Sequence, residues 1–175
     1  MRSRLLAAAL TIAVCAAQNP AGEIASVGVF FNPRFAEDRT EGYTVQLWRQ
    51  GEAVFGLLSV EALSGDAPVG ELSNVKFDER SGKLSFDAKL STGMLLMADN
   101  SQRPSRDLYR FHGAISKEIL SGTMTHSDLL DPAAGETSVK IRLPKQAAPG
   151  MVEAKTYRAW KEAIDALLKV RGPKG

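Results

Sequence analysis

The feature that most constrains the fold of this chain is an alternation of apolar and polar residues with a period of two, from about residue 26 to 143. It is clearest in 83–90, where the even-numbered residues are apolar and the odd-numbered ones are Lys, Ser or Asp. Successive side chains of a strand point to opposite faces, so this pattern predicts antiparallel strands with one buried face. The predicted strands span residues 26–31, 41–49, 52–62, 69–78, 83–90, 93–98, 107–115, 119–127 and 137–143.

Short glycine-containing turns predict that consecutive strands pair as hairpins, with loops at 49–51 and 79–82. A slip of one residue would move every apolar side chain to the polar face, so the pattern also predicts the register. Across the loop 79–82, it pairs Asp78 with Lys83, Phe77 with Leu84 and Val75 with Phe86. Across the loop 116–119, it pairs Ile115 with Leu120, Gly113 with Gly122, Phe111 with Met124 and Tyr109 with His126.

A helical pattern follows the strands. Residues 18–145 form the predicted barrel, 146–150 a linker, and 151–171 an amphipathic helix that packs outside the barrel as part of the same domain. The apolar stripe of this helix comprises Val152, Trp160, Ile164, Leu167 and Leu168. Segment 52–62 is apolar on both faces, which predicts a strand that is covered on both sides, with the helix as one cover.

The predicted fold is mainly β: a meander of about eight or nine antiparallel strands that closes into an up-and-down barrel, plus one C-terminal helix. This architecture resembles the lipocalins, small secreted barrels with a trailing helix, over about residues 26–171. The family's Gly-x-Trp signature near the first strand is absent, since 28–35 read GVFFNPRF. The resemblance therefore implies a fold and no functional residues. An open β-sandwich is the alternative, because a meander can also roll without closing.

Residues 1–17 have the features of a secretory signal peptide: a basic start, an apolar stretch from Leu5, and small residues at Ala16 and Ala17. Cleavage there predicts an extracytoplasmic protein, periplasmic or secreted. A lipid anchor at Cys15 is the minor alternative, because Val14 fits poorly before a lipidated cysteine. The apolar stretch is shorter than the roughly 20 residues that span a bilayer, so we expect no transmembrane segment.

The charge balance argues against nucleic-acid partners. The chain has 22 basic and 20 acidic residues, a net charge of +2. Loss of 1–17 removes two arginines and no acid, so the mature balance is 20 against 20. A neutral chain has no basic footprint for nucleic acid or an anionic membrane.

No catalytic pattern is visible, and we expect a protein that is not an enzyme and uses no cofactor. The only cysteine leaves with the signal, and one inward histidine is too few for a metal site. Ser127, His126 and Asp128 are neighbours on one strand, so their side chains point apart and form no triad.

Binding is the favoured function class. An eight-stranded barrel can hold one small ligand, and small residues on its predicted inner face favour spare volume. We expect a small apolar or amphipathic ligand, with candidate residues Tyr109, His126, Phe111, Met124 and Phe86. The alternative is a structural or protein-interaction module of the cell envelope with a filled core.

The apolar run 94–97 fits either an adaptable surface or a doubly covered strand, and we expect the strand. We expect the charged segment 32–39 to be an ordinary solvated loop, and a lid over one mouth is the alternative.

Overall fold

The computed structural model of the 175-residue chain describes residues 22–32, 34–36, 39–62, 67–97, 100–147 and 153–171. The predicted signal segment 1–17, with Cys15, lies outside the described residues, as do 148–150 of the predicted linker.

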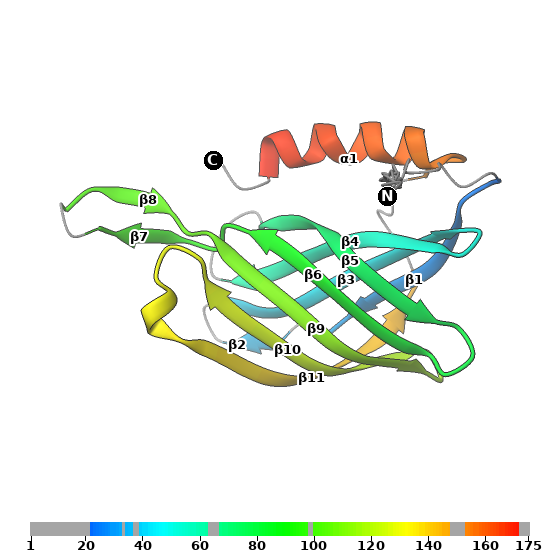
Figure 1. Cartoon of the computed structure of the whole chain (residues 1–175), viewed down its shortest axis with the longest axis horizontal. Coiled ribbons are helices and arrows are strands. Elements are labelled where there is room, and N and C mark those ends of the chain that lie inside the picture. The colour runs from blue at the N-terminus through cyan, green and yellow to red at the C-terminus, as the bar shows by residue number, and fades with distance from the viewer. Residues whose placement is uncertain are drawn as a thin grey trace, which may run out of the picture.

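Eight antiparallel strands form a closed barrel (Figure 1). They are β1 (Ala25–Phe31), β3 (Arg39–Gln50), β4 (Ala53–Ala62), β5 (Val69–Asp78), β6 (Lys83–Leu90), β9 (Asp107–Ser116), β10 (Ile119–Asp128) and β11 (Glu136–Gln146). The order around the barrel is β1-β11-β10-β9-β6-β5-β4-β3, and pairing of β3 with β1 closes it. The predicted barrel is confirmed, and the open sandwich is wrong.

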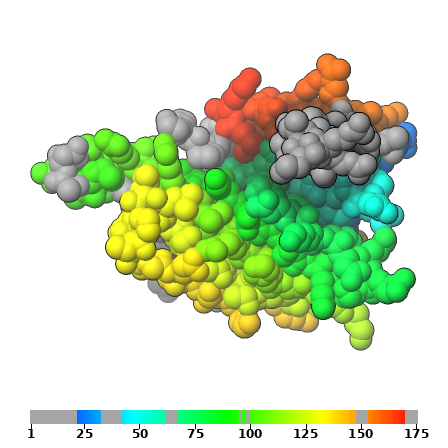
Figure 2. Space-filling view, in the orientation of Figure 1, coloured from blue at the N-terminus to red at the C-terminus, as the bar shows by residue number. Residues whose placement is uncertain are grey.

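Within the described residues, five further elements lie outside the barrel wall. They are β2 (Arg34–Ala36), β7 (Met94–Leu96), β8 (Gln102–Pro104), the 3-10 turn η1 (Pro132–Ala134) and the helix α1 (Tyr157–Arg171). Strand β2 pairs with the start of β3, within the charged segment 32–39 that we expected to be a loop. Strands β7 and β8 form a separate two-stranded sheet, and this hairpin projects from one end of the barrel (Figures 1 and 2).

The predicted hairpin registers hold with one exception. Across β9 and β10 every predicted pair is confirmed, including Tyr109 with His126. Across β5 and β6 the pairs at the tip are confirmed, but the register shifts between Ser73 and Lys76. Asn74 has a φ of 52° there, in the left-handed region that asparagine tolerates. This bulge replaces the predicted pair of Val75 with Phe86, because an inserted residue leaves no one-to-one partner.

Apolar side chains pack against one another inside the barrel. Its buried core comprises Phe30, Val45, Leu47, Leu58, Val60, Leu72, Leu84, Phe86, Ala88, Leu90, Tyr109, Phe111, Leu120, Met124, Ile141 and Leu143. The rings of Phe86 and Phe111 stack with centroids 5.1 Å apart. The predicted Gly113–Gly122 pair makes room for the Phe111 ring, since a Cβ at Gly122 would lie 2.8 Å from Phe111 Cε2.

The C-terminal helix covers the outer face of β3 and β4, as predicted. Trp160 is fully buried, with its ring 5.4 Å from that of Trp48 and 4.6 Å from that of Phe55. Strand β4 is therefore covered on both sides: Leu58 faces the barrel core, and Leu57 packs under the helix.

The ends of α1 and β11 differ from expectation. Strand β11 continues to Gln146, one residue past the predicted barrel end. The helix begins at Tyr157 and not at residue 151, because Thr156 Oγ1 accepts a hydrogen bond from the Ala159 N–H (3.2 Å) and caps the first turn. Val152 of the predicted stripe lies outside the described residues.

Candidate functional site

The β7–β8 hairpin presents apolar side chains to solvent. Met94 is 58% exposed and Leu96 is 69% exposed, although the barrel interior buries residues of the same kind. The expectation of a doubly covered strand at 94–97 is wrong. The physical reason is topological: β6 and β9 pair directly with each other, so the sheet has no place between them for β7.

The backbone of the hairpin leaves the outer edge of each strand without a partner strand among the described residues. Among the described residues β7 pairs with β8 and with no other strand. The edge of β8 is poorer in donors, because Pro104 has no N–H. The edge of β7 is therefore the better of the two for pairing with another strand.

A polar cluster around the buried side chains of Ser105 and Asp107 joins the two ends of the hairpin to the barrel. We call it the hairpin base; it consists of Thr92, Gly93, Ser105, Asp107 and His126. Asp107 Oδ2 accepts hydrogen bonds from Thr92 N (2.8 Å), Thr92 Oγ1 (2.7 Å) and Ser105 Oγ (2.6 Å). Asp107 Oδ1 lies 2.7 Å from Nε2 of His126. Ser105 Oγ in turn accepts from the backbone N–H groups of Thr92 (2.9 Å) and Gly93 (3.1 Å).

The hairpin base keeps its carboxylate charged. Burial of Asp107, which is 3% exposed, tends to raise its pKa, but hydrogen bonds from Ser105, His126 and Thr92 outweigh burial and hold the pKa below its usual range. Burial raises the pKa of Tyr109 strongly, and the charge of Asp107 raises it further. Tyr109 is therefore a neutral phenol at any ordinary pH.

The connectivity of the hairpin base is that of a structural brace. In a serine triad the histidine lies between the serine and the carboxylate, so that it can take the serine proton. Here the carboxylate lies between Ser105 and His126, and the Ser105 hydroxyl donates to it. The described ranges contain no cluster of three or more metal-ligating side chains.

The five predicted ligand residues come together, as a packed group inside the barrel. Phe86, Phe111 and Met124 are at most 1% exposed. The rings of Tyr109 and His126 are 4.8 Å apart. Whether any of the five contacts a ligand stays a prediction.

Sequence reasoning missed Asp107 as the partner of His126 and placed only Tyr109 opposite it. The predicted register already contained the signal. Because Tyr109 faces His126, Asp107 is the diagonal neighbour of His126 on the same face.

Comparisons of the chain with protein-family models, with curated proteins and with solved structures find no match. Within the part of the chain that the structure describes, no helix has both the length and the apolar character needed to cross a membrane. The class of protein thus rests on the fold: an eight-stranded closed antiparallel barrel with a covering helix.

Proposed function

We propose that this chain is a non-catalytic, extracytoplasmic β-barrel whose projecting β7–β8 hairpin binds an apolar surface of another protein of the cell envelope. The single observation that carries the proposal is the exposure of Met94 and Leu96 on a hairpin that the barrel does not cover. The extracytoplasmic location is supported by the signal-like composition of residues 1–17.

The hairpin base supports a role for the hairpin. An isolated two-stranded hairpin is marginally stable in water, so it needs an external support to keep one shape. Thr92 and Ser105 lie just outside the two ends of the hairpin, and both donate to the buried carboxylate of Asp107. Burying a charged carboxylate costs free energy. This cost has a reason if the hairpin must keep one shape in order to bind a partner.

The surface of the hairpin favours a protein partner. The open edge of β7 can pair with an extended segment through backbone hydrogen bonds, while pockets in the partner take the Met94 and Leu96 side chains. Methionine is flexible and polarizable, which suits it to such pockets.

The close packing of the core side chains supports this proposal over a small apolar ligand held inside the barrel. Ligand pockets are usually largely formed before the ligand binds. Here the residues expected to line such a pocket pack against one another, as in the stacked pair of Phe86 and Phe111.

Site-specific photocrosslinking in the native host tests the proposal. A photoreactive amino acid replaces Leu96 in the full-length chain, and a matched variant carries it at Val139, an apolar residue of β11 that is 46% exposed on the barrel body. We expect a discrete crosslinked protein from position 96 and none from position 139. Met94→Ser introduced beside the probe should reduce the yield several-fold, because it removes half of the apolar contact.

Equal adducts from both positions, or none from position 96, would contradict the proposal. An N-terminal sequence of the recovered protein that begins at Gln18 supports the location, whereas an intact Met1 contradicts it.

A further inference from the structure

A row of polar side chains crosses the outer face of the barrel, on five neighbouring strands. The pairings run directly from Lys76 on β5 to Ser85 on β6, His112 on β9, Thr123 on β10 and Lys140 on β11. We call this set the cationic row. It has a lysine at each end and contains no carboxylate. Lys140 Nζ donates a hydrogen bond to Thr123 Oγ1 (2.7 Å). The remaining residues of the row, Lys76, Ser85 and His112, form a separate group.

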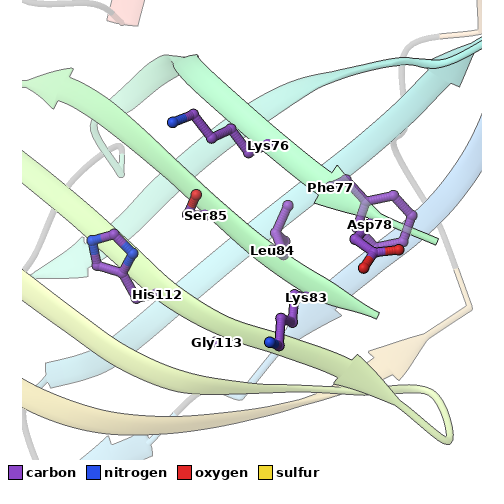
Figure 3. Close-up of a pocket in the computed structure, with 8 residues that line it drawn as sticks. All are labelled: Lys76, Phe77, Asp78, Lys83, Leu84, Ser85, His112 and Gly113. Atoms are coloured by element: carbon purple, nitrogen blue, oxygen red, sulfur yellow. The ribbon is translucent and has the colours of Figure 1, made fainter. Parts of the chain in front are cut away.

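Lys76, Ser85 and His112 have no hydrogen-bond or ion-pair partner for their side chains among the described residues. Figure 3 shows the three side chains on adjacent strands of one face. Neighbouring strands lie about 4.8 Å apart, so Lys76 and His112 stand roughly 10 Å apart at their bases with Ser85 between them. The flexible lysine can therefore reach over the serine hydroxyl.

The nearest carboxylates are already engaged. Asp78 accepts from the Ser81 hydroxyl (2.6 Å) and the Arg80 N–H (3.0 Å), which lower its pKa. Asp87 accepts from the Asn74 side-chain amide (2.7 Å). The cations of the row are therefore not neutralised by direct pairing with these acids.

The surface is hollowed at this group. Lys76, Ser85 and His112 line two adjoining hollows of about 470 and 380 Å³. Lys83 and Asp78 also line the larger hollow, and Asp87 lines the smaller one. The bulge at Asn74 borders the smaller hollow, because its extra residue bends β5 there.

We propose that Lys76, Ser85 and His112 bind a tetrahedral oxyanion, the phosphoryl or sulfate group of a larger molecule. An ammonium, a hydroxyl and an imidazole N–H that converge on one hollow offer donors to different oxygens of such a group. The five residues of the cationic row include no Phe, Tyr or Trp, so the donors of the row recognise the anion and not a sugar or base ring. The site lies on β5, β6 and β9 and is independent of the hairpin proposal.

Titration of the ¹⁵N-labelled protein with inorganic phosphate and with pyrophosphate, at constant ionic strength, tests the site. We expect saturable amide shifts centred on Lys76, Ser85 and His112. Lys76→Gln and His112→Gln should each weaken binding at least fivefold, and Ser85→Ala two- to fivefold. Lys89→Gln, a matched change of an exposed lysine on β6 outside the row, should leave binding unchanged.

Two arms then separate the sources of the phosphoryl group. Flotation with phosphatidylglycerol vesicles that is lost in Lys76→Gln assigns a lipid headgroup. Pyrophosphate binding without flotation assigns a soluble phosphoester. Shifts that do not saturate, or binding that Lys76→Gln and His112→Gln leave intact, overturn the proposal. Leu96→Ser should not alter the shifts, which separates this site from the hairpin.

Discussion

Asp107 accepts hydrogen bonds through both carboxylate oxygens while its side chain is almost fully buried. An ionised group in such a place is stable only if its partners replace water, and Thr92, Ser105 and His126 do so. At the residue scale, Asp107 therefore differs from an ordinary strand residue in being buried and ionised, with protein groups in place of water.

The first prediction concerns the pH dependence of stability. The folded-state pKa of Asp107 is depressed, so its contribution is complete above the unfolded value of about 3.9 and is lost as the pH falls through the folded value. Asp107→Asn should lower the free energy of unfolding at pH 7 by about 1–3 kcal/mol, because the amide cannot accept all of these bonds. It should also flatten the decline in acid, as measured by urea denaturation between pH 7 and pH 3.

Asp131→Asn is the control for that prediction. Asp131 is exposed and makes no side-chain cap hydrogen bond, so this variant should follow the wild-type pH curve. The depressed pKa of Asp78 contributes equally to all three proteins and cancels in the comparison. An Asp107→Asn curve parallel to wild type would contradict the role of the charge.

The second prediction concerns the glycine pair under Phe111. A Cβ at Gly122 would lie 2.3 Å from the His112 carbonyl oxygen and 2.6 Å from the Gly113 Cα, and backbone cannot yield as a side chain can. Gly122→Ala should therefore destabilise the fold by at least about 1–3 kcal/mol, the usual cost of overpacking. Gly93→Ala, where a Cβ meets nothing within 4 Å, should stay within about 0.5 kcal/mol. Chemical denaturation of both variants decides the matter.

At the element scale, α1 and the outer face of β3–β4 bury each other. Trp48, Phe55 and Leu57 would expose a large apolar surface without the helix. An ion pair also connects α1 to the neighbouring strand β5, since Lys161 Nζ lies 2.5 Å from Glu71 Oε2. We therefore expect the helix and the barrel to unfold as one unit.

The third prediction follows from that packing. Ile164 is fully buried between the helix and the sheet, so Ile164→Ala should lower the free energy of unfolding by about 2–5 kcal/mol. Ala166→Ser, on the exposed face of the same helix, should cost less than about 0.5 kcal/mol. Equal stability of the two variants in urea denaturation would show that the helix is not docked.

At the scale of the whole molecule, we expect the barrel and the hairpin to have separate stabilities. Among the side chains that the structure describes, none from β7 or β8 belongs to the barrel core, and the hairpin meets the barrel at its base. A change to the hairpin should therefore alter binding without unfolding the barrel.

The fourth prediction uses this separation. Leu95 and Arg103 lie directly opposite each other, so replacing residues 96–102 by Asn-Gly gives a two-residue turn that keeps the hairpin base. The thermal midpoint should change by less than about 2 °C, because no described side chain of this segment belongs to the barrel core. A photoreactive group at position 95 of this short form should give no crosslinked partner. A large fall in the midpoint would show that the hairpin is part of the cooperative core.

Much of the fold was predictable because it depends on local repetition. The period of two placed most strands, and the turn residues with the apolar pattern set the β9–β10 register, including Tyr109 opposite His126. The candidate site was harder to predict from the sequence. The projecting β7 and the brace at Asp107 both depend on which strands become neighbours after the chain has closed.

The sequence by itself determined the alternating strands, the covering helix and the apolar content of the core, since each depends on residues close together in the chain. Only the tertiary structure decided that β3 meets β1, that β6 meets β9 and excludes β7, and that Lys76, Ser85 and His112 share one outer row. Closure of the barrel is a non-local event in which backbone groups of distant strands must pair with one another. Local periodicity does not indicate which pairing of distant strands gives every strand edge of the barrel a hydrogen-bonded partner.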